Sequence, residues 1–134
     1  MSGERPNAAF DGFQKRSGLV VPFSWRKIEL AIDRAVEDVS RKQRIAKNEG
    51  LASKVTDQVL RQLNIPQSEF YVHPDETGKR VPKIEDVQDL VEIALAEQGE
   101  TLVVATYKRY RKQREIARRN IRVRGENLQG AVDV

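Results

Sequence analysis

Apolar residues recur every three or four positions in four separate stretches of the chain. This spacing places them on one face of a helix, so each stretch predicts an amphipathic α-helix. The first stretch follows Ser24, a good N-cap residue, and the second follows Gly50, a helix-breaking signal. The four stripes are Ile28, Ala31, Ile32, Ala35, Val36 and Val39; Leu51, Val55, Val59, Leu60 and Leu63; Val87, Leu90, Val91, Ala94 and Leu95; and Val103, Val104, Tyr107 and Tyr110.

Two short extended segments precede the first helix. Residues 13–16 and 19–23 flank the turn pair Ser17-Gly18, a pattern that predicts a β-hairpin. Pro22 places the second strand at an edge or at its end. The predicted fold class is therefore α+β, mostly α, with a short N-terminal hairpin packed on a bundle of about four helices.

The pattern also predicts where the folded domain begins and ends. Residues 1–12 are polar and aperiodic, which predicts a flexible N-terminal tail. One domain is expected over 13–119, with residues 65–83 as a long loop or a second hairpin. Residues 120–134 lose the helical period and are expected to form a tail or linker.

Composition excludes several classes of function. The 134 residues contain no cysteine, which excludes a disulfide framework, a cysteine zinc site and a catalytic thiol. His73 is the only histidine, so no metal site is expected, and no apolar run approaches the ~20 residues of a membrane span. No nucleophile–base pair or Walker-type glycine loop indicates a catalytic residue. We expect a cytoplasmic protein that is not an enzyme.

Charge is unevenly distributed. The segment from Lys108 to Arg124 contains nine basic residues and one acid, Glu115. Such a run favours an anionic partner, or it forms a solvated helix face. Any nucleic acid binding through it would be weak, non-specific phosphate contact.

A second basic feature lies at the predicted hairpin turn. Lys15 and Arg16 precede Ser17-Gly18, and Lys27 lies one turn into the following helix. Two lysines, an arginine and a helix N-terminus that meet at one place would bind phosphate. The same residues also occur in ordinary solvated turns, so the spacing alone leaves both interpretations open.

Three segments resemble the ATP-cone domain. They are Lys15-Arg16-Ser17-Gly18 through Lys27-Ile28, Ile84 through Glu92, and Tyr107 through Arg114, which is similar to the closing Y-x-x-Y-R-x-x-R of that family. The matched segments follow one another in order over residues 13–114. Two departures stand out, because Ser17 replaces the usual aspartate and the 65–83 segment is longer than the usual link.

The resemblance implies a nucleotide site and its residues. Lys15 and Arg16 match the phosphate-contacting pair, and Lys27 matches the helix lysine. The hairpin backbone and the start of the first helix would flank the base and sugar. The full candidate set is Lys15, Arg16, Ser17, Gly18, Ser24, Lys27, Ile28, Gln88, Arg111 and Lys112.

The resemblance also implies function and partners. ATP or dATP, with or without Mg²⁺, would act as an allosteric effector of a ribonucleotide reductase catalytic domain or subunit, or of a stand-alone cone, through nucleotide-dependent homo-oligomerisation. Reductase chemistry needs cysteines, so this chain would be a regulatory domain. The alternatives are a nucleic-acid-binding transcriptional regulator related to the reductase repressor but without its zinc ribbon, and an interaction module that has lost its ligand.

Overall fold

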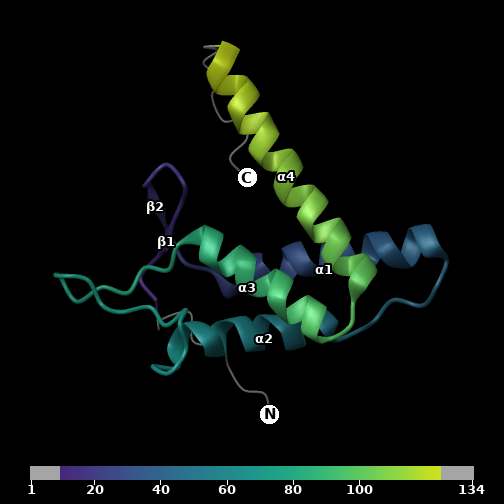
Figure 1. Cartoon of the computed structure of the whole chain (residues 1–134), viewed down its shortest axis with the longest axis horizontal. Helices are drawn as coiled ribbons and strands as arrows, with labels where there is room; N and C mark the ends of the chain where they lie inside the picture. Colours follow the sequence, from purple (N-terminus) through teal and green to yellow (C-terminus); the bar gives the residue numbers. More distant parts are fainter. Residues whose placement is uncertain (1–9, 125–134) are drawn as a thin grey trace.

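The computed structural model of the chain describes residues 10–124, and it contains one small hairpin and four helices (Figure 1). The elements are β1 (Phe13–Gln14), β2 (Val20–Val21), α1 (Trp25–Gln43), α2 (Leu51–Asn64), α3 (Ile84–Glu97) and α4 (Thr101–Arg124). The predicted fold class, a short hairpin on a mostly helical domain, is confirmed.

The ends of the helices follow the local sequence signals. Ser24 occupies the N-cap position of α1, although its side chain makes no capping hydrogen bond. Gly50, with φ 85°, precedes α2, and α2 ends at Asn64, two residues before Pro66. Gly99, with φ 76°, ends α3, because glycine adopts this left-handed conformation without a Cβ penalty.

The helices pack around one core. α1 lies against α2 and α4, and α3 lies against the same two helices, so each helix has two neighbours. The residues predicted from the stripes form most of the buried core, and Ile32, Val55, Leu63, Val91 and Leu95 are almost completely inaccessible to solvent. Burying a side chain of this size contributes roughly 1.5–3 kcal/mol, so the stripes hold the bundle together.

A buried carboxylate joins α1 to α4. Asp38 is 5% exposed on α1, and its pKa is lowered first by the hydrogen bond that the Tyr110 hydroxyl donates. Lys42 lies 3.2 Å from the same carboxylate, and Arg109 on α4 lies 3.8 Å from it. The buried charge is therefore surrounded by donors and cations from both helices, as a buried carboxylate requires.

The hairpin is tied to the chain that leads into α3. Phe13 pairs with Val21 and Gln14 with Val20 in the antiparallel register. Gln14 also forms a parallel bridge with Lys83, and its amide donates to the Pro82 carbonyl at 2.9 Å. The turn of the hairpin is therefore held beside the first turn of α3.

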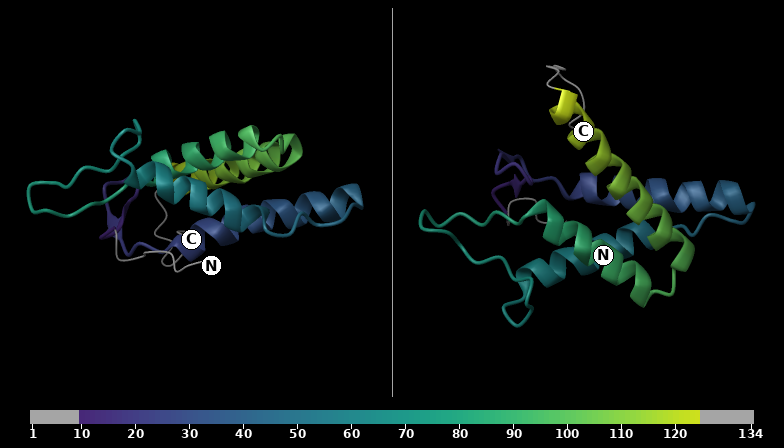
Figure 2. Two further views of the ribbon diagram at one scale, coloured as in Figure 1. Left: turned by 90° about the horizontal axis from the view of Figure 1, so that it is seen from below. Right: turned by 45° about the horizontal axis from the view of Figure 1, so that its top comes forward.

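The 65–83 segment is a long loop that extends past the helices next to the hairpin (Figure 2). Arg80 fixes its second half, because its guanidinium donates to the Val72 carbonyl at 2.9 Å and to the Leu63 carbonyl at 3.2 Å. The same guanidinium lies 4.8 Å from the ring centroid of Phe10 and 5.1 Å from that of Tyr71. This loop therefore has a defined structure.

Two differences from the sequence expectations concern the ends of the domain. Phe10, within the segment expected as a flexible tail, is 4% exposed and packs on Phe23 with ring centroids 5.0 Å apart. Helix α4 continues to Arg124, into the segment 120–134 that was expected to be a tail or linker. Residues 1–9 and 125–134, where the rest of both expected tails falls, lie outside the described residues.

Candidate functional site

The turn between β1 and β2 has a closed hydrogen-bond pattern. The Lys15 amide donates to the Leu19 carbonyl at 2.8 Å, and the Gly18 amide donates to the Lys15 carbonyl at 2.8 Å. Gly18 has φ 94°, and a Cβ there would meet no atom within 4 Å, so the glycine is needed for its conformation and not for space. The Ser17 hydroxyl oxygen accepts a hydrogen bond from the Leu19 amide at 3.3 Å.

A shallow cavity of about 220 Å³ opens beside this turn. Its lining residues are Gln14, Lys15, Arg16, Lys83 and Glu85. It lies between the hairpin and the start of α3, whereas the sequence placed the site between the hairpin and α1. Ligand pockets commonly measure roughly 300–1,000 Å³, so this cavity has room for phosphate groups but not for a whole nucleotide unless the hairpin moves.

Arg16 links the hairpin to two helices. Its Nε contacts the Glu85 carboxylate on α3, and its Nη1 lies 3.2 Å from Glu115 Oε2 on α4. The hydrogen bond from Arg16 lowers the pKa of Glu115. All three side chains are partly exposed, so an incoming anion can reach the guanidinium and compete with both carboxylates.

The predicted residues of α1 differ in their accessibility. Ile28 is 7% exposed and belongs to the core, so its side chain is not available to a ligand in this conformation. Lys27 is exposed one turn into the helix, and its amide donates to the Ser24 carbonyl at 3.2 Å. Among Ser24, Lys27 and Ile28, Lys27 is the residue whose exposed side chain can extend a positive charge toward a bound phosphate.

The predicted residues of α3 and α4 lie on the two helices that Arg16 contacts. Gln88 is half-buried three residues after Glu85, and Lys112 is exposed three residues before Glu115, which places each on the same helix face as its neighbour. Arg111 lies 2.8 Å from Glu92 and also contacts Asp89, so it joins α4 to α3.

Sequence reasoning missed four residues at this place: Gln14, Lys83, Glu85 and Glu115. Lys83 and Gln14 meet through a bridge between segments far apart in the chain, and no local pattern predicts that contact. Glu115 did leave a signal, because it is the single acid in a basic run. A lone opposite charge in such a run is a candidate for a specific ion pair.

A family comparison covers the same part of the chain. The sequence model of the ATP cone domain matches residues 13–116, from the first residue of β1 to the residue after Glu115. The match covers most of the chain and includes every residue of the proposed site. The chain belongs to the ATP-cone family. Domains of this family bind adenine nucleotides as effectors and regulate activity, so this cone is a nucleotide-binding allosteric regulatory domain.

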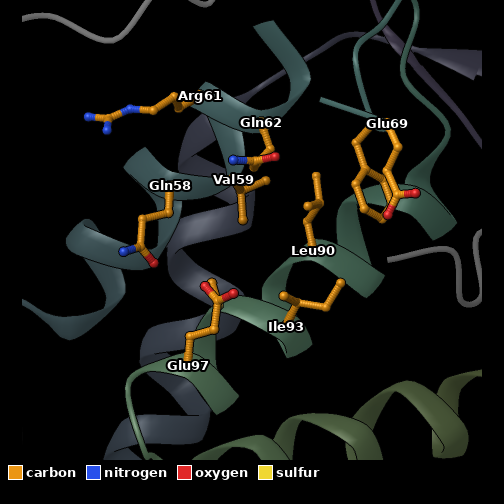
Figure 3. A pocket seen from close by; sticks show the side chains of 10 residues that line it. Gln58, Val59, Arg61, Gln62, Glu69, Leu90, Ile93 and Glu97 are labelled. Carbon is orange, nitrogen blue, oxygen red and sulfur yellow. The ribbon is translucent and has the colours of Figure 1, made fainter. Parts of the chain in front are cut away.

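A second cavity, of about 350 Å³, lies between α2 and α3 (Figure 3). Gln58 and Gln62 from α2 face Leu90, Ile93 and Glu97 from α3 across it. The Gln58 Oε1 atom is buried without a hydrogen-bond partner. None of the cations of the hairpin site lines this cavity, so size alone does not locate the nucleotide site.

The aromatic residues of the cone have structural positions. Tyr107 is 8% exposed, and burial raises its pKa to about 12. Trp25 packs against the core, and the Arg26 guanidinium lies 5.4 Å from the ring centroid of Trp25. The His73 ring makes an edge contact with Tyr71 at 4.7 Å. The burial of Tyr107 agrees with its place in the apolar stripe of the fourth predicted helix.

Two negative findings apply to the part of this cone that the structure describes. None of its helices combines the length and apolar composition that crossing a membrane requires. Within residues 10–124, carboxylates and histidine do not gather in groups of three or more that could hold a metal ion.

Proposed function

We propose that the cone binds ATP and dATP at the hairpin turn and transmits their binding through Arg16. The single observation that supports this best is the cavity beside the turn, where Lys15, Arg16 and Lys83 come together. Clustered cations next to backbone amides suit the phosphates of a nucleotide. Lys27 would add a fourth cation from α1.

The phosphates would exchange partners with the two carboxylates on Arg16. In the structure described here, Glu85 and Glu115 share the guanidinium. A polyphosphate carries more charge than either carboxylate, and a pair of its oxygens can accept both hydrogen bonds of the guanidinium fork, so it would attract Arg16 away from them. Any Mg²⁺ would arrive on the nucleotide phosphates. Binding would therefore loosen the hairpin from α3 and α4.

This exchange supplies a way to regulate. A ligand shifts an equilibrium only by its different affinities for two states. The state with Arg16 on its carboxylates and the state with Arg16 on phosphate differ in how the hairpin sits on the bundle. ATP and dATP differ by one 2′-hydroxyl, and a hydrogen bond left unmade in a buried site costs about 1–3 kcal/mol. That difference is sufficient for the two nucleotides to favour different states.

Titration calorimetry of the chain with ATP and with dATP tests the binding step. We expect saturable binding of both nucleotides, with no ADP detected by ion-exchange chromatography after prolonged incubation. Guanosine triphosphate serves as the control for base selectivity. The absence of both heat and a thermal shift with ATP and dATP would contradict the proposal.

The proposed partner is a ribonucleotide reductase catalytic domain or subunit, with self-association of cones as the mechanism. A 1–3 kcal/mol difference corresponds to a shift of roughly 5- to 150-fold in an assembly equilibrium. Sedimentation velocity over a protein concentration series, without nucleotide and with each nucleotide, should give different mass distributions. Identical distributions at saturation would exclude an assembly switch in this chain and would leave only control through the partner.

A further inference from the structure

The two halves of α4 have different environments. In the first half, Val103, Thr106 and Tyr107 are buried against the bundle. Beyond Arg111 the helix extends past α1 and α3 (Figures 1 and 2). In this part of the helix, Glu115 forms an ion pair with Arg16 of the hairpin. Most residues between Lys112 and Arg119 are exposed, so this part of the helix is largely open to solvent.

This projecting half carries a strong positive charge. The segment from Lys108 to Arg124 has nine basic residues, and its one acid, Glu115, is paired with Arg16 and lies 3.5 Å from Arg119. Among the described residues, four of these cations have no carboxylate within ion-pair distance; they are Lys108, Lys112, Arg114 and Arg118. The positive charges of these four side chains are therefore not neutralised by a carboxylate of the described residues.

The cations follow the helical repeat. Arg114 and Arg118 are four residues apart, so they lie on one face, and Arg111, which precedes them there, is held by Glu92 and Asp89 of α3. Lys108 and Lys112, four residues apart, form a neighbouring row. The two rows flank Glu115, which is paired with Arg16 and Arg119, so the helix carries positive charge on two sides and suits a partner that presents negative charge on two sides.

We infer that the distal half of α4 binds double-stranded DNA by lying in the major groove and contacting the phosphates of both strands. An α-helix about 10–12 Å across fits the roughly 12 Å major groove of B-DNA. The deep, narrow major groove of duplex RNA does not admit a helix. Lysine and arginine that contact only phosphates carry no base information, so the binding is independent of sequence.

Fluorescence anisotropy with a labelled duplex of about two helical turns, measured over a series of salt concentrations, tests this inference. The test protein is the full chain with Lys108→Gln, Arg114→Gln and Arg118→Gln. Its matched control carries Lys54→Gln, Arg61→Gln and Lys79→Gln, which remove the same charge from exposed positions outside α4. Circular dichroism verifies that both proteins keep their helices.

The expected result is salt-dependent binding that the α4 variant loses and the control retains. Each phosphate contact contributes about −0.9 to the slope of log K against log salt, so the α4 variant should lose roughly 2.7 from that slope. Its affinity at low salt should fall about tenfold or more, while that of the control changes less than twofold.

Three results would overturn the inference. Equal weakening of the two variants would mean that only net charge matters. Equal affinity for an RNA duplex of the same sequence would exclude docking in the major groove. Stronger competition by polyglutamate than by unlabelled DNA would identify an acidic protein surface as the partner. None of these results depends on nucleotide binding at the hairpin, so they leave the proposed function untouched.

Discussion

Two turns of this cone share one backbone geometry and differ in what surrounds them. In the hairpin turn, the Lys15 amide donates to the Leu19 carbonyl at 2.8 Å. In the loop turn, the Asp75 amide donates to the Lys79 carbonyl at the same distance. Each has a glycine with positive φ at the fourth position, Gly18 at 94° and Gly78 at 84°.

Their side chains do opposite things. The Asp75 carboxylate closes the loop turn on itself, because it accepts hydrogen bonds from the Thr77 amide at 2.8 Å and from the Lys79 amide at 3.0 Å. In the hairpin turn, Arg16 instead makes its contacts on α3 and α4, with Glu85 and Glu115. Backbone shape alone therefore does not make a ligand site; long-range, exchangeable contacts of the side chains distinguish the two turns.

The largest expected effect is the loss of ATP affinity when a cation of the hairpin site, and not one of the loop turn, is removed. Replacing Lys15 or Lys27 by alanine should weaken ATP binding about tenfold or more, because a hydrogen bond to a charged group contributes roughly 1.5–3 kcal/mol. Replacing Lys79 in the loop turn should change it less than twofold. Calorimetric titration of the three variants measures this. Unchanged affinity in both the Lys15 and Lys27 variants would make the hairpin turn an ordinary solvated one.

Alanine at the two glycines tests the shared geometry. Gly18→Ala and Gly78→Ala should each destabilise the fold by about 1 kcal/mol, because alanine resists the left-handed conformation. Urea unfolding measures this loss. Only Gly18→Ala should also weaken ATP binding, since it changes the turn that carries the cations. A similar loss of ATP binding in Gly78→Ala would remove the distinction between the two turns.

A smaller effect, of opposite sign, is expected when a competing carboxylate is removed. Glu85→Gln should tighten ATP binding by about two- to fivefold, since an exposed ion pair contributes roughly 0.2–1 kcal/mol that the phosphate no longer has to displace. Glu76→Gln in the loop turn is the control and should have no effect. Weaker ATP binding in Glu85→Gln would show that this carboxylate supports the site and does not compete with the ligand.

The smallest expected effect is a change in the pKa of one carboxylate of the two turns' contacts and not of the other. The pKa of Glu115 lies below its ordinary 4.5, mainly because Arg16 donates a hydrogen bond to the carboxylate. The pKa of Asp75 lies below its ordinary 3.8, mainly because the Thr77 hydroxyl donates a hydrogen bond to it. NMR titration of Arg16→Ala should return Glu115 toward 4.5 and leave Asp75 low. A change in the pKa of both carboxylates would mean that the two turns are coupled.

The same shifts fix the sign of a pH dependence. A carboxylate with a lowered folded pKa stabilises the fold above its unfolded pKa, and this stabilisation is lost as pH falls through the folded value. The melting temperature should therefore drop as the solution is acidified below about pH 4. Arg16→Ala should lose part of that acid sensitivity.

The helices and the hairpin could be predicted from the sequence because their signals are local. The stripe from Ile28 to Val39, the break at Gly50 and the acids Glu85 and Asp86 in the first turn of α3 all act within a few residues. The fold class follows from them, and so do the cations of the hairpin turn.

The rest depends on contacts between distant segments. The burial of Phe10 involves Arg80, and the position of Lys83 in the cavity involves Gln14. Asp38 is a charged residue outside the apolar stripe of the first helix, yet it is buried. Tyr110 and cations from two helices surround its carboxylate. Periodicity carries no information on such pairs, so the contact between the hairpin and the start of α3 could not be predicted from it.

Backbone amide chemical shifts during an ATP titration test the central claim most directly, since they report on both turns in one experiment. The account predicts that the largest shifts fall on residues 15–19, with further shifts at Lys83, Gln88 and Glu115. The loop turn at 75–79 should change little, because its hydrogen bonds are satisfied within the turn. The largest shifts in the loop turn or in the cavity between α2 and α3, with the hairpin unchanged, would contradict the account.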